Sequence, residues 1–205
     1  MTMTTVRAEP FDGLRTGPVE VIHWQWLPFD ALSREQLYEV LRLRSEVFVV
    51  EQNCVFQDMD GLDDQAMHLL GVRASADSAP CPPPALRAPP LPTQNPLPPG
   101  LPGTSVGESE PQLVAYVRCF PAGVTFEEAS IGRVVTRQSA RGGGLGHVLM
   151  AEAIRALQQQ WGVQPIRIGA QAHLKSFYER HGFADVGKPY VEDGIDHIEM
   201  VRTPV

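Results

Sequence analysis

Residues 131–149 read IGRVVTRQSARGGGLGHVL, and this stretch decides the fold. Ala129–Thr136 has the apolar, β-branched composition of a strand, and Leu145 starts an apolar pattern at helical spacing. The turn between them, Arg141–Gly146, contains four glycines. Such a turn before a helix gathers backbone N–H groups and the positive end of the helix dipole, so it predicts a cradle for an anion. Glycines suit this place because side chains would hold a diphosphate away from the backbone.

Two common anion-binding loops do not fit this turn. A P-loop requires Lys followed by Ser or Thr after the last glycine, and this chain has His147 and Val148 there. A dinucleotide-binding loop requires a third glycine where Leu149 stands, and an acidic residue about 20 positions further on. The remaining pattern is Arg-x-x-Gly-x-Gly, formed by Arg141, Gly144 and Gly146.

This pattern resembles the pyrophosphate loop of the GNAT superfamily of acetyltransferases. Residues 171–183, QAHLKSFYERHGF, resemble the second signature of that superfamily, a helix that carries Tyr and ends in Gly-Phe. The superfamily commonly has Asn and Ala where this chain has Gln171 and Leu174. Four further segments are similar to the ElaA-type branch: FVVEQNC at 48–54, QDMDG at 57–61, GAQAH at 169–173 and EDGIDH at 192–197. The resemblance covers about residues 19–202, apart from a proline-rich stretch.

The proline-rich stretch interrupts the domain between two strands. Residues 80–111 contain 12 of the 19 prolines, and proline removes backbone donors and restricts the residue before it. We therefore expect an extended or disordered insertion at about 75–111, a flexible N-terminal tail at 1–17 and a single domain over 18–205.

The resemblance implies a mixed α/β (α+β) GNAT fold. Its central mixed, partly antiparallel sheet is flanked by helices and splayed between the two parallel strands that bind coenzyme A, Ala129–Thr136 and Ile166–Ala170. From the residue patterns we expect further strands over 19–26, 67–73, 113–120, 183–186 and 195–202, and helices over 33–48, 145–157 and 172–181.

The resemblance also implies that acetyl-CoA is the acyl donor. The residues that would hold it are Val134, Val135, Thr136, Arg141, Gly142, Gly143, Gly144, Leu145, Gly146 and Gln171. Tyr178 occupies the position that supplies the general acid in many GNAT enzymes, for which the alternative is a core tyrosine on an apolar helix face.

The general base has two candidates, Glu51 and His197. Glu51 follows an apolar run, and burial would raise its pKa toward neutrality; the alternative is an ion pair with an arginine such as Arg44. His197 is of a residue type that titrates near 6.5, although a histidine on a terminal strand can be structural. The acidic turn at 58–64 and the pair at 192–193 would either hold a cationic substrate or be solvated.

Composition excludes several classes of protein. The formal net charge of −7 argues against nucleic acid as a partner, and no apolar run reaches membrane-spanning length. The N-terminus lacks the apolar stretch of a signal peptide, so we expect a cytoplasmic protein with its three cysteines reduced. The six histidines show no metal-ligand spacing, and no metal is expected. Exposed sheet edges would suit a homodimer.

These observations predict an acetyl-CoA-dependent N-acetyltransferase in which the amine of a small molecule or peptide attacks the acetyl group directly. Two alternatives remain open. One is a related-fold acyltransferase with a different acyl donor, such as an acyl-homoserine lactone synthase, which residues 43–51, LRSEVFVVE, resemble to some degree. The other is a catalytically silent module that binds or senses acyl-CoA.

Overall fold

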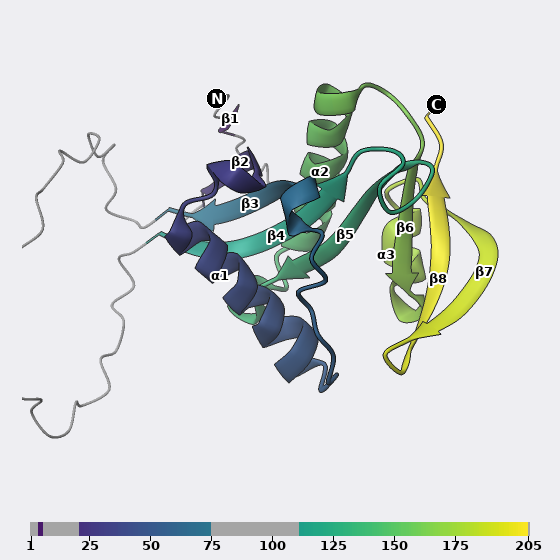
Figure 1. The fold of residues 1–205 in the computed structure, drawn as a ribbon, viewed down its shortest axis with the longest axis horizontal. Coiled ribbons are helices and arrows are strands. Elements are labelled where there is room, and N and C mark those ends of the chain that lie inside the picture. The colour runs from purple at the N-terminus through teal and green to yellow at the C-terminus, as the bar shows by residue number, and fades with distance from the viewer. Residues whose placement is uncertain (1–3, 6–20, 75–110, 205) are drawn as a thin grey trace, which may run out of the picture.

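The computed structural model describes residues 4–5, 21–74 and 111–204. One eight-stranded sheet runs through them in the order β1-β2-β3-β4-β5-β6-β8-β7 (Figure 1). The strands are β1 (Thr4–Thr5), β2 (Ile22–Pro28), β3 (Met67–Arg73), β4 (Gln112–Phe120), β5 (Ala129–Thr136), β6 (Ile166–Gln171), β7 (Ala184–Glu192) and β8 (Ile195–Arg202). The helices are α1 (Arg34–Arg44), α2 (Leu145–Trp161) and α3 (Lys175–Glu179). Neighbouring strands are antiparallel except β5 and β6, which are parallel, so the predicted fold class is confirmed.

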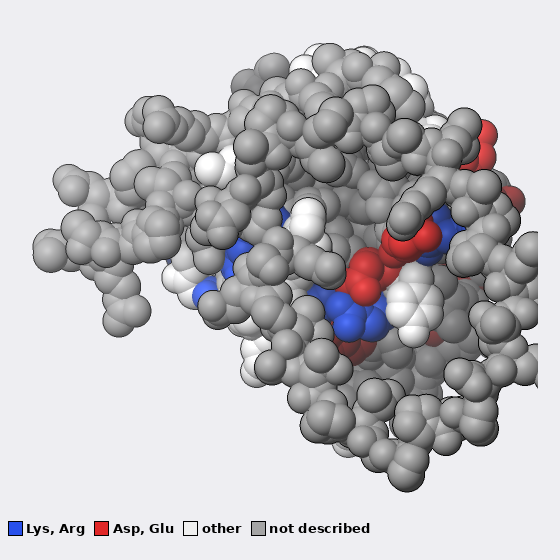
Figure 2. All heavy atoms as spheres, turned by 90° about the vertical axis from the view of Figure 1, so that its left-hand side faces the viewer, with Lys and Arg blue, Asp and Glu red and all other residues white. Residues whose placement is uncertain are grey.

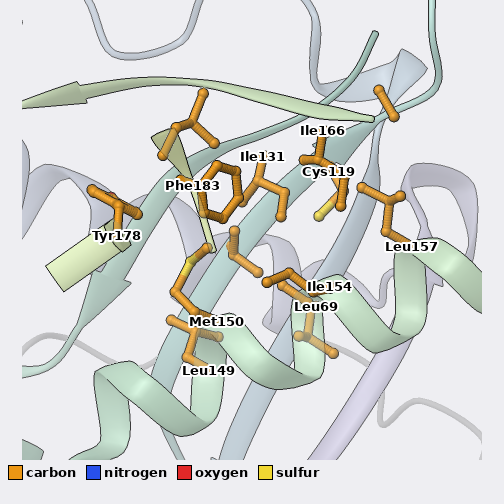
Figure 3. Packing of buried hydrophobic residues seen from close by; sticks show 14 of the residues in the cluster. Leu69, Cys119, Ile131, Leu149, Met150, Ile154, Leu157, Ile166, Tyr178 and Phe183 are labelled. Atoms are coloured by element: carbon orange, nitrogen blue, oxygen red, sulfur yellow. The ribbon is translucent and has the colours of Figure 1, made fainter. Parts of the chain in front are cut away.

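Two apolar clusters cover the two faces of the sheet. On one face α2 and α3 pack against β4, β5 and β6, and Figure 3 shows Leu149, Met150 and Leu157 of α2 facing this cluster. On the other face α1 contributes Val40 and Leu43 to a smaller cluster. The central strand β4 is therefore buried on both sides, and its apolar run is continuous rather than alternating.

The helix α1 begins at the predicted capping box. The backbone N–H of Gln36 donates to the Ser33 hydroxyl at 3.1 Å, and the Ser33 N–H donates back to the Gln36 side chain at 2.9 Å. The helix continues as a π-helix, Ser45–Glu51, whose wider turns are frequent beside functional sites. This segment carries Phe48 towards the divergence of β5 and β6, and Glu51 towards Arg141.

The strands β5 and β6 pair over two residues only, Ala129 with Ile166 and Ser130 with Arg167, and then diverge. On its other side β5 pairs with β4, where one extra residue of β5 forms a bulge. Arg133 lies in this bulge with φ +53°, a left-handed conformation that is uncommon for residues other than glycine. The bulge and the divergence together leave the β6-facing edge of β5 open.

The largest differences from the sequence prediction lie near the C-terminus. The helix predicted over 172–181 is a 3₁₀ turn, Ala172–Leu174, followed by the short α3, and the left-handed Gly182 follows its C-terminal turn. The strand predicted to stop at 186 continues to Glu192, because a bulge between Asp185 and Pro189 accommodates Gly187 and the proline on an edge strand. The predicted tail lies outside the described residues except β1, and the predicted insertion lies outside them through residue 110.

Charged side chains on the left-hand face of the molecule are mixed in sign. Figure 2 shows Asp and Glu next to Lys and Arg where described residues are visible. On α1, Arg42 pairs with Glu39 at 2.7 Å, and Arg137 from the chain beyond β5 pairs with Glu46 at 2.8 Å. In residues 21–74 and 111–204 no helix is long and apolar enough to span a membrane.

The buried His68 predicts a pH dependence of folding. Its Nε2 lies 2.9 Å from the Asp63 carbonyl, which can only accept, so Nε2 carries the proton and Nδ1 accepts from the Tyr116 hydroxyl at 2.8 Å. Burial lowers the pKa of His68, so the neutral form is favoured in the folded state. The unfolded chain binds the extra proton below pH 6.5, and stability is lost as the pH falls from there towards the folded pKa.

We therefore expect the free energy of unfolding in urea to fall between pH 7 and pH 5, at most about 1.4 kcal/mol per pH unit for this histidine. A His68→Gln variant should show a shallower slope, whereas His173→Gln, at an exposed position, should keep the slope of the parent. An unchanged slope in His68→Gln would contradict the neutral assignment.

Candidate active site

The glycine-rich turn forms an open anion cradle. Gly142 and Gly144 have φ of +90° and +80°, and Gly144 is the N-terminal cap of α2. A Cβ at Gly142, Gly143 or Gly144 would meet nothing within 4 Å, so space lies beside the backbone of the turn. Within the described chain the amides of these three glycines donate to no acceptor. The first amides of α2, from Leu145 and Gly146, have no partner inside the helix by its geometry. The arrangement suits a diphosphate.

Gly146 has a second role. A Cβ there would lie 3.6 Å from the ring of Phe177, an ordinary contact, so α3 packs directly against the start of α2 with room for no side chain much larger than a methyl group on that side. His147 follows and contacts the same ring, with centroids 4.7 Å apart. The glycine turn and the Tyr178-bearing helix are thus held side by side.

Arg141 holds Glu51, which corrects the expectation for that carboxylate. Two guanidinium nitrogens of Arg141 bind the two carboxylate oxygens, one of them at 3.0 Å, and Nε and Nη2 also donate to the Thr136 carbonyl. The hydrogen bond from Arg141 lowers the pKa of Glu51, so the expected rise towards neutrality is wrong. The sequence alternative of an arginine partner is correct, but the partner is Arg141 rather than Arg44.

The open edge of β5 carries Val134, Val135 and Thr136. The side chain of Val135 is buried in the cluster under α1, while Val134 faces the opposite cluster and also lines the cavity described next. Since β6 pairs with β5 only at its beginning, backbone groups along this stretch that face β6 have no strand partner. An extended ligand arm could pair with them.

A cavity of about 330 Å³ lies where β5 and β6 diverge. Among the catalytic and cofactor-binding candidates predicted from the sequence, Val134, Gln171, Tyr178 and His197 line it, and so does the acidic pair at 192–193. Glu51, Arg141, the glycine turn, Val135 and Thr136 do not. The divergence of the strands therefore brings one candidate acid and one candidate base to the same cavity.

Tyr178 lies at the edge of the apolar cluster, as Figure 3 shows, and its side chain reaches the cavity. The residue is 7% exposed, and burial raises the pKa of its hydroxyl to about 12. Within the described chain that hydroxyl makes no hydrogen bond. Buried hydroxyls are normally paired, so an unpaired one that opens on a cavity is suited to donate to a ligand.

His197 is oriented by its own strand. Its Nδ1 lies 2.8 Å from the Ile195 carbonyl, and because a carbonyl only accepts, Nδ1 carries the proton. In the neutral ring Nε2 is then a free acceptor, as a base requires. The ring stacks on Tyr190 with centroids 5.3 Å apart. The geometry makes His197 a better candidate base than the ion-paired Glu51.

Tyr190 is a cavity residue that the sequence reasoning missed. A Cβ at Gly169 would lie 2.2 Å from the Tyr190 hydroxyl, so the absence of a side chain at Gly169 allows this ring to cross β6. Tyr190 was not predicted as a site residue because its strand was expected to end at residue 186. An aromatic residue four positions before the glycine of the tight turn at Gly194 was the available signal.

Carboxylates of the acidic turn at 58–64 form ion pairs with arginines of α1 and β4. Arg44 binds Asp58 and Asp63, each at 2.7 Å, and Arg118 binds Asp60 at 2.5 Å and Asp63 at 2.8 Å. The hydrogen bond from Arg118 holds the pKa of Asp60 well below its usual range. The expectation that this turn would hold a cationic substrate is therefore weakened, since Asp58, Asp60 and Asp63 already have arginine partners and only the exposed Asp64 has none among the described residues. A single arginine inside the apolar run of β4 was the signal for this network.

No group of three or more His, Cys, Asp or Glu side chains is placed to hold a metal ion in the parts of the chain that the structure covers.

Known proteins share both the sequence and this architecture. The family model for the acetyltransferase (GNAT) domain matches residues 106–204. Protein ElaA of Escherichia coli is 35% identical and the match covers 89% of this chain and 97% of ElaA; a UPF0039 protein of Synechocystis is 36% identical with the same coverage. The crystal structure of Escherichia coli ElaA gives a TM-score of 0.65 over 88% of this chain and 99% of that one. An acyl-CoA N-acyltransferase from Pseudomonas aeruginosa gives 0.65 at 35% identity, with the same coverage.

These matches span nearly the whole relatives and include both the glycine turn and the Tyr178 helix. The family supports acyl transfer from an acyl-CoA, the chemistry to which an open diphosphate cradle beside a splayed sheet is suited. The chain belongs to the GNAT acetyltransferase family, within its ElaA branch.

Proposed function

We propose that this protein transfers the acetyl group of acetyl-CoA to a primary amine by direct attack of the amine on the thioester. The observation that carries the proposal is the hydroxyl of the largely buried Tyr178, which is unpaired within the described chain and opens on the cavity where β5 and β6 diverge. The glycine turn at the start of α2 supports binding of the acetyl-CoA donor. The cavity where β5 and β6 diverge supports binding of the acceptor amine.

The donor binds as an extended molecule. Its diphosphate lies on the amides of Gly142–Gly146, where the helix dipole favours negative charge. Its pantetheine arm pairs with the open edge of β5 between Val134 and Thr136. Gln171, which donates to Gln52 at 3.2 Å, lines the cavity at the end of β6 and contacts the arm from the opposite strand.

The reaction requires that the attacking amine be neutral, that the oxyanion on the carbonyl oxygen be stabilised and that the leaving thiolate be stabilised. His197 accepts the amine proton at Nε2, directly or through one water. The amine nitrogen then bonds to the thioester carbon, and an unpaired amide of β5 stabilises the oxyanion. When the carbon–sulfur bond breaks, Tyr178 donates a hydrogen bond to the leaving sulfur. Because its pKa of about 12 exceeds that of a simple thiol, Tyr178 stabilises the thiolate without giving up its own proton. The second proton of the attacking nitrogen leaves as the intermediate collapses and protonates the thiolate, so the products are the acetamide and the free CoA thiol.

The assignment of the base has a direct test. In an assay that follows release of the CoA thiol, we expect His197→Gln to lower kcat about 100-fold, the lower end of general-base effects. Asp196→Asn is the control for damage to the exposed β7–β8 hairpin and should keep kcat within about twofold.

Glu51→Gln should also keep kcat within about twofold, because its carboxylate is held by Arg141 rather than aimed at the cavity. It should tighten acetyl-CoA binding, since a negative charge beside the diphosphate site is removed. A large loss of kcat in Glu51→Gln with full activity in His197→Gln would reverse the assignment. Absence of amine-dependent thiol release in the parent protein would reject the function.

A further inference from the structure

The residues that line the cavity indicate the size, shape and charge of the acceptor amine. The acceptor shares about 330 Å³ with the acyl end of the donor, since Val134 and Tyr178 line the same space. That volume is at the small end of the range for small-molecule pockets. Two contacts join the loop after the π-helix to the opposite wall: Gln52 with Gln171, and the Cys54 thiol with the Asp193 carbonyl at 3.3 Å. A small free molecule fits this space better than a protein tail.

The wall on the α1 side of the sheet is aromatic. Four of the eight phenylalanines line the cavity, namely Phe48, Phe56, Phe120 and Phe126. They come from four separate segments: the π-helix, the loop after it, the end of β4 and the turn before β5. Phe120 is almost fully buried and the other three are half-buried, so their exposed faces form apolar surface inside the cavity. Such a wall favours an apolar body, and stacking favours a ring.

Three charged residues, Asp60, Arg118 and Arg133, also line the cavity on this side, and each of them is already paired. Arg118 is 3% exposed, binds Asp60 and lies over the ring of Phe120, 4.9 Å from its centroid. Arg133 pairs with Asp58 at 2.7 Å and lies 5.9 Å from the centroid of Phe56. The Ser130 and Thr125 hydroxyls, which also line the cavity, bind each other at 2.5 Å. A second charged group on the acceptor would meet apolar rings and no free ion partner on this side.

The opposite rim is acidic. Glu192 and Asp193 line the cavity beside His197, and neither forms an ion pair within the described chain. Two free carboxylates attract an incoming ammonium group and repel an acceptor that carries its own carboxylate.

We infer that the acceptor is a small monoamine whose amino group is carried on an apolar, ring-sized body without a carboxylate. The inference rests on the proposed acetyl transfer and narrows it. The ring lies against the phenylalanines, and the amino group lies between His197 and the strand divergence.

The test compares four probes with the full-length protein at saturating acetyl-CoA: 2-phenylethylamine, ethylamine, phenylalanine and 1,4-diaminobutane. We expect kcat/KM for 2-phenylethylamine to exceed that of each other probe at least about tenfold. Ethylamine lacks the ring, phenylalanine adds the carboxylate, and 1,4-diaminobutane replaces the ring by a second ammonium group. Equal or better use of any of these three overturns the inference while leaving the acetyl transfer standing.

A matched pair of variants locates the ring. Phe126→Ala removes a half-buried ring from the cavity, and Phe29→Ala removes a half-buried ring elsewhere. Phe126→Ala should reduce the preference for 2-phenylethylamine over ethylamine about tenfold with the KM for acetyl-CoA unchanged, and Phe29→Ala should leave the preference unchanged.

Equal losses for both amines in Phe126→Ala would overturn the placement of the ring. Protein that binds acetyl-CoA but uses none of the four probes would overturn the acceptor class. Protein that binds no acetyl-CoA would instead remove the proposed function.

Discussion

Substitution of Tyr178 by Phe is expected to lower kcat about 100-fold and to leave the affinity for acetyl-CoA unchanged. The change removes only the hydroxyl, which opens on the cavity and has no partner in the described chain. The ring stays in place against Phe177 and Phe183, so packing is retained. Loss of the hydrogen bond to the leaving sulfur therefore raises the barrier without weakening binding.

The control is Tyr38→Phe, since Tyr38 is 70% exposed on α1 and does not line the cavity. Both variants should unfold within about 0.5 kcal/mol of the parent, because neither loses a buried hydrogen bond. If Tyr178→Phe retained full kcat, Tyr178 would be a core residue only. An activity loss accompanied by a large loss of stability would show a packing role instead.

Substitution of Gly143 by Glu is expected to weaken acetyl-CoA binding about 100-fold or more. Among the three glycines of the open turn, Gly143 is the one without positive φ, and a Cβ there meets nothing within 4 Å. The folded structure therefore accepts the side chain without strain. The added carboxylate lies at the diphosphate cradle, and at 4 Å two unit charges repel by about 4 kcal/mol near a protein surface, more than the 2.7 kcal/mol of a 100-fold change.

Gln160→Glu adds the same charge at the exposed far end of α2 and is the matched control. It should bind acetyl-CoA as the parent does. Equal binding by Gly143→Glu would mean that the turn only connects a strand to a helix.

Local sequence signals specified much of the site. The strand, glycine turn and helix over 129–157 were readable because glycines, apolar spacing and helix starts act over a few residues. The capping box at Ser33 and the strands β3, β5 and β8 were predicted for the same reason. Tyr178 could be predicted because its helix belongs to the family signature that ends at Gly182.

Long-range pairing could not be read in this way. Glu51 and Arg141 are 90 positions apart, and Arg118 is 58 positions from Asp60, so their meeting depends on how the sheet and loops close. The same holds for Tyr190, whose place across Gly169 depends on the bulge in β7 and its register with β8. A shift of one residue in the pairing of β7 with β8 would turn the side chain of Tyr190 to the other face of the sheet.

The most direct measurement is a calorimetric titration of the full-length protein with acetyl-CoA, without an acceptor. We expect saturable binding of one acetyl-CoA per chain with a Kd in the range of about 1 μM to 1 mM, the usual range of enzyme KM values. Absence of binding by protein shown to be folded would contradict the donor site, and with it the assignment of acetyl transfer.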